Sequence, residues 1–403
     1  MEQASRRFRR SLDLNRGDLK LYKLSGKNSI VLLLCLRALY SMNWYNVSPM
    51  LFNITSTYRV NSALSGLILS AFLIGTGLFQ IPSGLVASKI GSKNTALTGM
   101  AIMSVAATTS LISPDFTVFL VTRFVVGLGS AFFFSSGIAV LNDIDERNVS
   151  RNIAAFNTAF SVGGGFGVVG FAYLLQFTSW QNLLAAGGVV TLVLTIVSFI
   201  LIPDLSAKSS KRNEFGKNVY KRLTSRPLLL LSMSLAGYWG LNFTFEEYLQ
   251  PFAEKLGFSG PISGFIGSLS LFAGLLGMIL FAYFSSKKAS VILPSLVIFI
   301  SAVLALQFFG LSYYLFLTAI LGGSISVIIF SLEYSYVVKL ETEKQFVALG
   351  ISIMNALQIA TGSAITFLFG YLFSVNADLS WVILGIIALI FLPMGISVMK
   401  QKN

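Results

Sequence analysis

The segment Gly84-Leu85-Val86-Ala87-Ser88-Lys89-Ile90-Gly91-Ser92-Lys93 is a short basic stretch between two long apolar runs. Glycine adopts turn conformations that other residues avoid, and Gly84 and Gly91 frame this segment. Lys89 and Lys93 add positive charge, which is enriched in the cytoplasmic loops of membrane proteins. We therefore predict a cytoplasmic hairpin between two membrane helices.

Features of the first half of the chain return 198 positions later. The matched pairs are Ser65-Gly66 with Ser263-Gly264, Ser88-Lys89 with Ser286-Lys287, Asn157 with Asn355, Gly164 with Gly362 and Tyr173 with Tyr371. An offset of about half the chain, kept in early and late segments, is typical of a parallel internal repeat. The chain is predicted to consist of two like halves.

The composition excludes a soluble domain of this length. Of 403 residues, 55% are hydrophobic and 11% charged, and the mean hydropathy is +0.77. About 20 apolar residues suffice to cross a hydrocarbon core of about 30 Å. We count twelve such runs, near residues 29–54, 61–86, 95–112, 116–141, 153–177, 183–202, 227–252, 262–284, 290–309, 313–338, 346–373 and 381–399. The predicted fold class is an all-α membrane protein with twelve transmembrane helices in two pseudo-twofold-related six-helix bundles.

The loops between these runs are short, so neighbouring helices should be antiparallel. We predict a basic cytoplasmic tail at 1–27, an N-terminal bundle at 28–203, a cytoplasmic linker at 204–226 and a C-terminal bundle at 227–403. Charged, Asn and Gln residues concentrate in spans one, four, five, seven, ten and eleven. We expect spans one, four, seven and ten to surround a central path, and the nearly pure apolar spans three, six, nine and twelve to face lipid.

The basic residues are distributed unevenly between the two sides of the predicted membrane. Alternating assignment of loops places 25 of 29 Lys and Arg on one side, with Arg59 and Lys255 on the other and Arg37 and Arg123 within spans. This bias predicts a multi-pass protein of the cell membrane with both termini cytoplasmic, and it argues against nucleic acid as the reason for the net charge of +13. The single cysteine, Cys35, allows no internal disulfide.

Two motifs resemble those of the major facilitator superfamily. The loop between the family's second and third helices is similar at Gly84, Lys89, Gly91 and Lys93, although Ser88 stands where the family has an acidic residue that ties the loop to a neighbouring helix. The stretch Arg123-Phe-Val-Val-Gly-Leu-Gly129 resembles the family's fourth-helix motif. The resemblance implies a secondary transporter that works by alternating access.

Arg37 is the first candidate for substrate binding. It lies about ten residues into a helix that rises 1.5 Å per residue, so it falls near the bilayer midplane, where a guanidinium needs a polar cavity or a partner. Ser41 and Trp44 follow at helical spacing on the same face. A guanidinium binds a carboxylate or phosphate through two parallel hydrogen bonds, although a structural arginine that pairs with backbone carbonyls or a glutamate fits the sequence too.

Further polar residues near mid-span could contact the substrate. Tyr238 and Asn242 share a helix face with Glu246, and the repeat relates Asn355 to Asn157, which favours a common orientation toward a cavity. Gln358 follows Asn355 at i+3. These residues complete the predicted substrate-binding set of Arg37, Ser41, Trp44, Tyr238, Asn242, Asn355 and Gln358.

Glu246, Glu247 and Glu333 are the carboxylates within the predicted spans, and the chain has no histidine. A side chain that carries a proton should therefore be one of these or a loop carboxylate. We favour Glu246 over Glu247 as the inward residue. Glu333 fits either proton coupling or a gating salt bridge, for instance with Arg147. Arg123, Glu246 and Glu333 form the predicted coupling or gating set.

The glycine run that contains Gly163 and Gly167 has the spacing of close helix packing, which we expect at the interface of the two halves. Phosphate binding by these glycines is disfavoured because they lie inside an apolar span.

The sequence thus favours a secondary transporter of a small organic anion, proton-coupled as a symporter and acting as a monomer with a small-molecule substrate in a lipid bilayer. A drug or cation efflux antiporter of the same superfamily is the alternative. A polytopic membrane enzyme is more distant, since no cluster of acids, histidines or metal ligands is visible at one membrane face. We expect no cofactor, no metal and no nucleic-acid partner.

Overall fold

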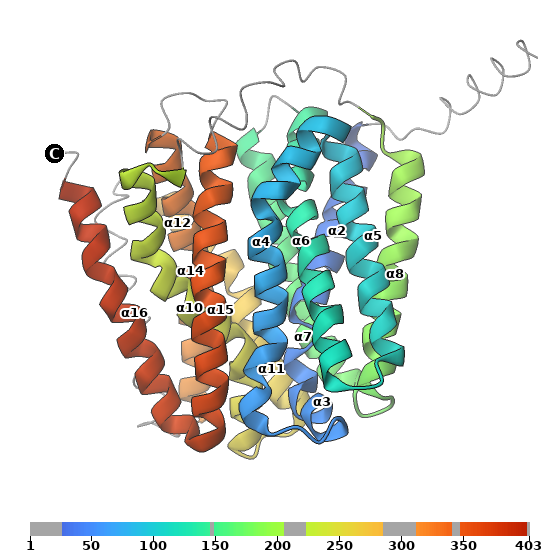
Figure 1. Cartoon of the computed structure of the whole chain (residues 1–403), viewed down its shortest axis with the longest axis vertical. Helices are drawn as coiled ribbons and strands as arrows, with labels where there is room; N and C mark the ends of the chain where they lie inside the picture. Colours follow the sequence, from blue (N-terminus) through green and yellow to red (C-terminus); the bar gives the residue numbers. More distant parts are fainter. Residues whose placement is uncertain (1–25, 146–148, 205–222, 285–311, 341–346, 401–403) are drawn as a thin grey trace, which may run out of the picture.

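The computed structural model describes residues 26–145, 149–204, 223–284, 312–340 and 347–400, which form membrane-length helices joined by short loops (Figure 1). The first half contains α2 (Gly26–Tyr45), α3 (Leu51–Thr57), α4 (Gly66–Ile90), α5 (Ser92–Thr109), α6 (Phe116–Ile144), α7 (Val149–Leu174) and α8 (Trp180–Leu201), with 3-10 turns η1 (Ser48–Met50), η2 (Ser62–Leu64) and η3 (Ser110–Ile112). The second half contains α10 (Arg226–Lys255), α11 (Gly260–Phe272), α12 (Gly274–Phe284), α14 (Ser312–Leu340), α15 (Val347–Val375) and α16 (Ala377–Lys400).

The described residues include ten candidate membrane spans and a shorter apolar helix at Ala377–Phe391 within α16. They correspond to eleven of the twelve predicted spans. The predicted ninth span, at 290–309, and most of the linker at 204–226 lie outside the described residues. The predicted all-α membrane fold with two six-helix bundles is confirmed.

The two halves meet through two pairs of helices, α4 with α15 and α7 with α11 and α12. Figure 1 shows the first pair side by side at the boundary between the halves. An offset of 198 residues carries α4 onto α11–α12 and α7 onto α15. The two contacts are therefore images of each other under the internal repeat, as a pseudo-twofold axis requires.

Repeat-related glycines allow this close approach. A Cβ at Gly66 would lie 2.8 Å from the carbonyl oxygen of Thr366 on α15, and a Cβ at Gly264 would lie 2.3 Å from Ala172 on α7. Small residues let helix backbones come together inside a membrane, where water does not drive association. The repeat therefore preserves the contact surface as well as the fold.

The basic segment that separates the second and third spans is a hairpin with a single-residue turn. α4 ends at Ile90, α5 begins at Ser92, and Gly91 between them has φ +87°, a conformation that glycine adopts readily. The Lys93 side chain is buried and donates hydrogen bonds to the carbonyls of Phe199 (3.2 Å) and Ile202 (2.5 Å). The positive charge thus lies at the C-terminal end of α8, where backbone carbonyls lack helical partners.

The first predicted span is not one continuous helix. α2 ends at Tyr45, and the chain continues through η1 into α3. Pro49 lies at the start of η1, and a proline ring inside a helix clashes with the carbonyl four residues earlier, which here belongs to Tyr45. Helix α2 ends where this clash would begin.

The glycine run on α7 packs differently from the prediction. A Cβ at Gly163 would lie 2.1 Å from the carbonyl oxygen of Ala38, and one at Gly167 would lie 2.9 Å from Met42, so both glycines pack against α2 of the same half. Gly165, on another face of α7, approaches Phe272 of the second half. The small-xxx-small pair therefore serves packing within the first bundle, and the prediction that it lies between the halves is wrong.

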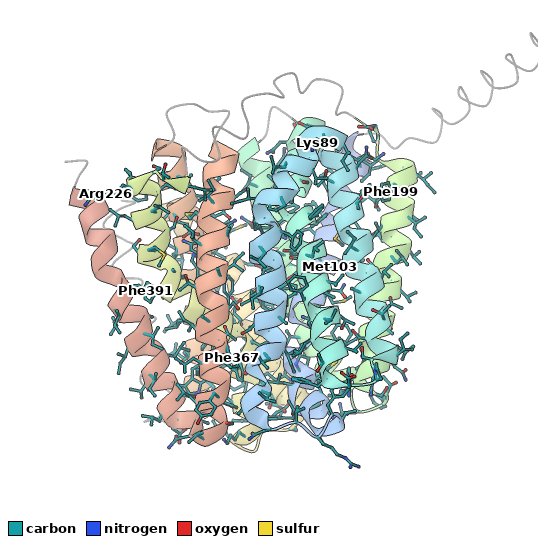
Figure 2. All side chains as sticks on the ribbon, viewed as in Figure 1. Lys89, Met103, Phe199, Arg226, Phe367 and Phe391 are labelled. Atoms are coloured by element: carbon teal, nitrogen blue, oxygen red, sulfur yellow. The ribbon has the colours of Figure 1, made fainter. Side chains whose placement is uncertain are left out.

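Large apolar side chains cover the outside of the molecule, for example Leu78, Phe166, Ile279 and Ile390, each more than 60% exposed. Figure 2 shows Lys89 and Arg226 at the same end of the bundle. A hydrocarbon-facing perimeter with basic residues at one end matches a membrane protein that follows the charge rule for loops.

Candidate substrate cavity

A cavity lies between the two halves and is lined by α2, α4, α6 and α7 of the first and α10, α11, α12, α14 and α15 of the second. The volume open to the centres of water-sized molecules is about 130 Å³. None of the described residues of α5, α8 and α16 lines it. Spans two, five, eight and eleven thus join the predicted one, four, seven and ten around the central path.

Aromatic side chains form most of the cavity wall. They are Tyr40, Trp44, Tyr45, Phe134, Phe160, Trp239, Phe243, Phe330 and Tyr334. The rings of Trp44 and Phe243, which come from different halves, lie 6.2 Å apart, and Phe243 lies 5.5 Å from Trp239. These rings contribute apolar surface and negative ring faces to the same cavity.

Arg37 lines the cavity and is 3% exposed. Its guanidinium carbon lies 4.2–5.1 Å from the ring centres of Tyr40, Phe134, Phe156 and Phe160, close enough for cation–π attraction. Arg37 interacts electrostatically with Tyr40, whose hydroxyl lies 2.7 Å from that of Ser130. Among the described residues, the Nε and Nη1 atoms have no hydrogen-bond partner. The aromatic rings thus stabilise the charge of Arg37, and two nitrogen atoms of its guanidinium group have no hydrogen-bond acceptor.

Glu333 of α14 lines the cavity, and its hydrogen-bond partners belong to the second half of the chain. Trp239 Nε1 donates to both carboxylate oxygens, at 3.1 and 3.0 Å, and Gln358 Nε2 donates to Oε2 at 3.1 Å. The residue is 1% exposed. Its proposed partner Arg147 lies outside the described residues, so the predicted gating salt bridge stays a prediction.

Glu246 of α10 also lines the cavity, but it connects the two halves. The Tyr45 hydroxyl of α2 donates to Glu246 Oε2, and Asn242 lies one helical turn before Glu246 and lines the same cavity. Glu247 is buried outside the cavity lining. The sequence argument that favoured Glu246 as the inward residue agrees with this geometry.

The repeat-related pair Asn157 and Asn355 lines the cavity from α7 and α15. Asn355 exchanges hydrogen bonds with Tyr334, at 2.8 Å from its Nδ2 and 3.1 Å to its Oδ1. Both polar ends of the Asn355 amide are therefore engaged within the second half.

Two residues of the predicted substrate-binding set do not line the cavity. Ser41 is buried where α7 closely approaches α2, since a Cβ at Gly164 would lie 2.6 Å from its hydroxyl. Tyr238 is fully buried and does not line the cavity; its ring lies 5.5 Å from that of the lining residue Trp239. The helical periodicity of the sequence predicts which way a side chain points, but not whether a residue of another helix covers it. The sequence therefore placed Ser41 and Tyr238 at the cavity.

Arg123 of α6 is buried apart from the cavity. Its Nη1 donates to Asn46 Oδ1 at 3.4 Å, its guanidinium carbon lies 5.3 Å from the ring centre of Phe72, and it interacts electrostatically with Glu247 across the halves. The loop-motif residues Gly84, Lys89, Gly91 and Lys93, at the end of α4 and the start of α5, do not line the cavity either.

Sequence reasoning missed Gln80 and most of the aromatic wall. Gln80 is an isolated amide inside an apolar run, the signal that identified Gln358, and it could have been found in the same way. The aromatic residues carry no such signal, because 35 phenylalanines and 14 tyrosines in this chain include many that pack elsewhere.

Three consecutive residues of α10 close the cavity at the end opposite Lys89. Besides the bond from Tyr45 to Glu246, Ser48 Oγ donates to the Glu247 carbonyl at 2.6 Å, and the hydroxyls of Ser65 and Tyr248 lie 2.9 Å apart. Each partner belongs to the first half. Glu246 is therefore shared by the cavity and by the closure of the halves.

An aromatic cavity with buried charged residues, between two repeat-related helix bundles of a membrane protein, is typical of a solute transporter. The chain matches the Major Facilitator Superfamily over residues 33–358 and belongs to that family. It is accordingly a multi-pass membrane transporter and not an enzyme.

Curated relatives are similar over parts of the chain. Protein spinster homolog 3 of Homo sapiens is 26% identical over 279 residues, 62% of this chain and 54% of that protein. A probable sugar efflux transporter of Helicobacter acinonychis is 24% identical over 291 residues, 68% of this chain and 70% of that protein. The 4-hydroxybenzoate transporter PcaK of Pseudomonas aeruginosa is 26% identical over 184 residues, 45% of this chain and 41% of that protein. The matched region thus spans about half the length of the first of these.

Solved structures share the fold over nearly the whole chain. A bacterial homolog of the human lysosomal transporter Spinster, in an inward-facing and unoccupied conformation, superimposes with a TM-score of 0.74 at 13% identity, covering 93% of this chain and 96% of that one. The occupied, inward-facing form has a TM-score of 0.73 at 14% identity.

Removal of the Tyr248 hydroxyl should favour opening of the end opposite Lys89. A buried neutral hydrogen bond contributes about 0.5–1.5 kcal/mol, so Tyr248→Phe should raise the open population roughly 2- to 10-fold. With Cys35 replaced by Ala, spin labels at the exposed positions Ser56 and Leu256 would report the distance between the halves.

The matched control is Tyr173→Phe, which removes a hydroxyl from an exposed tyrosine of α7. Ser65→Ala should reproduce the Tyr248→Phe shift, and the double variant should add little to either. An unchanged distance distribution in Tyr248→Phe would show that this bond does not hold the halves together.

Proposed function

We propose that the chain is a secondary active transporter that moves a small organic anion by alternating access, with proton coupling. The observation that carries this proposal is the Arg37 side chain. It is the only Lys or Arg among the described residues that line the cavity, and its Nε and Nη1 atoms lack acceptors there. A guanidinium offers two parallel donors to a carboxylate, and a fully buried one gains most from such a partner.

The relatives support transport of small solutes, and one of them is named for an aromatic acid. The closing bonds lie away from Lys89, which fits an inward-facing form like that of the structural neighbours if Lys89 is cytoplasmic. We accordingly place both termini in the cytoplasm and the protein in the cytoplasmic membrane, as a monomer with bundles at 28–203 and 227–403.

Glu246 is our choice for the coupling proton. Its hydrogen bond to Tyr45 crosses between the halves, so its protonation state bears directly on their closure. Glu333 accepts hydrogen bonds from Trp239 and Gln358, which both belong to the second half. Protonation of Glu333 would therefore change contacts within the cavity wall rather than contacts between the halves. Arg123 is proposed to organise the buried region beside Glu247.

A drug or cation efflux antiporter is the second candidate. Two glutamates and an aromatic wall in one cavity are features that would also suit an organic cation. The charge of Arg37 in the same cavity opposes this function, so its removal separates the two candidates.

Arg37→Ala should abolish binding of organic anions, and Arg37→Lys should weaken it strongly. Lysine keeps the charge but loses the planar two-point geometry, and a lost charge-assisted hydrogen bond of about 1.5–3 kcal/mol corresponds to roughly 10- to 100-fold in affinity. Titration of the purified protein with phenylacetate, succinate, glucose and tetraphenylphosphonium would measure this.

Lys255→Ala is the matched control, because it removes a positive charge from an exposed position outside the cavity. Thermal melting in detergent separates lost binding from lost folding. Normal anion binding by a folded Arg37→Ala protein would refute the anion site, and tighter tetraphenylphosphonium binding would favour the efflux candidate.

Glu246→Gln should abolish accumulation driven by a pH gradient while it keeps substrate exchange. An amide has nearly the shape of the carboxyl group but cannot release a proton. Uptake of radiolabelled phenylacetate into proteoliposomes, with a proton gradient or with counter-substrate alone, distinguishes the two modes. Glu333→Gln should retain gradient-driven uptake, and the reverse pattern in the two variants would assign coupling to Glu333.

The orientation is tested with single cysteines in a Cys35→Ala background. An impermeant maleimide should label Ser56→Cys in intact cells, whereas Ser210→Cys in the linker should react only after permeabilisation. Labelling of position 210 from outside would invert the proposed topology.

A further inference from the structure

The size of the cavity limits the body of the substrate. About 130 Å³ is close to the roughly 150 Å³ of an apolar cavity that holds one benzene molecule. The wall around this space includes Trp44, Trp239 and Phe243, whose rings favour edge and offset contacts with another ring. The cavity therefore suits a single aromatic ring better than a fused or extended body.

Three buried side chains that line the cavity carry polar atoms without partners among the described residues. Arg37 has the donors Nε and Nη1, Asn242 has the acceptor Oδ1, and Gln80 has the acceptor Oε1. The three residues are 3%, 1% and 2% exposed. Unpaired buried polar groups are unfavourable, so each favours a ligand that completes its hydrogen bonds.

The structure shows which end of the Asn242 amide is unpaired. Of the polar atoms of the Asn242 amide, the oxygen Oδ1 is the one that is buried without a hydrogen-bond partner among the described residues, and an amide oxygen only accepts hydrogen bonds. The amide oxygen is thus the end of Asn242 that a ligand can still engage. A substrate group that reaches Asn242 must therefore donate.

The helices place this acceptor and Arg37 at different depths. Tyr45 and Glu246 are in contact, Arg37 precedes Tyr45 by eight residues, and Asn242 precedes Glu246 by four. Because α2 and α10 occupy equivalent places in the repeat and run the same way, a rise of 1.5 Å per residue separates Arg37 from Asn242 by about 6 Å along the axis. The two residues therefore lie at different depths of the cavity, so one substrate molecule can contact them with its two opposite ends.

We propose that the substrate is a single-ring aromatic acid with a hydroxyl or amino group at the end of the ring remote from its carboxylate. The carboxylate binds Arg37 of the first half, the ring contacts the aromatic wall, and the remote group donates to Asn242 of the second half. This inference rests on the proposed function, because it uses Arg37 as the anion site. It adds the ring, the donor and Asn242 as the residue that selects for the donor.

The test is a titration of the purified full-length protein with five acids. They are 4-hydroxybenzoate, 4-aminobenzoate, 4-methoxybenzoate, benzoate and cyclohexanecarboxylate. The hydroxyl and amino compounds should bind roughly 3- to 10-fold more tightly than benzoate, the gain from one neutral hydrogen bond. The methoxy compound keeps the oxygen but cannot donate, so it should gain nothing, and the saturated ring should bind more weakly than benzoate.

Asn242→Leu should bring the affinities for 4-hydroxybenzoate and benzoate to about the same value, whatever it does to the affinity for benzoate. Asn355→Leu is the matched control, because Asn355 is a cavity amide whose two polar ends are both paired with Tyr334. Asn355→Leu should leave the ratio of the affinities for 4-hydroxybenzoate and benzoate unchanged, even if it changes both affinities. If Asn242→Leu does not fold, the five acids on the unaltered protein still decide the proposal.

The outcomes separate this inference from the proposed function. Equal binding of 4-hydroxybenzoate, 4-methoxybenzoate and benzoate, lost in Arg37→Ala, would overturn the donor while the anion site stands. Equal binding of cyclohexanecarboxylate and benzoate would overturn the aromatic requirement. A ratio that survives Asn242→Leu would remove Asn242 as the selecting residue. Binding of these acids that is indifferent to Arg37→Ala would overturn the anion site itself.

Discussion

The rest of the cavity depends on a guanidinium held near the middle of a membrane helix by aromatic rings. A charge at this depth costs about 2.5–3.5 kcal/mol on insertion scales. Four ring faces and one tyrosine hydroxyl around Arg37 offset part of that cost. Rings attract a cation without using its hydrogen-bond donors. The arrangement therefore stabilises the charge and still leaves it able to bind an anion.

The opposite charges of the cavity belong to the opposite half. Arg37 is on α2, whereas Glu246 and Glu333 are on α10 and α14, each engaged by neutral hydrogen-bond donors. A ligand that contacts both halves is thus placed between charges of different sign. Glu246 joins this cavity to the bonds that Ser48 and Ser65 make with the next two residues of α10. Glu246 therefore takes part both in the cavity and in the closing contacts.

The fold was predictable from the sequence because its signals are long and repeated. Spans of about 20 apolar residues and a constant offset of 198 determine the helices and their pairing, since lipid requires every backbone group to be paired within a helix. Charged and amide residues of the cavity were predictable where they interrupt apolar spans, as for Arg37, Glu333 and Gln358. Ser41 and Tyr238 were misplaced because layer depth depends on neighbours from other helices. The break after Tyr45 follows from Pro49, which local reasoning could have found.

The hairpin at Gly91 has a mechanical consequence for the first half. A turn of one residue leaves no slack between α4 and α5, and the bonds from Lys93 to Phe199 and Ile202 fasten α5 to the end of α8. Three helices are thereby joined at the end of the molecule where Lys89 lies. A rotation of α4 relative to α15 must therefore move α5 and α8 as well. The three helices move as one rigid unit, and any bending of the first half occurs outside this hairpin.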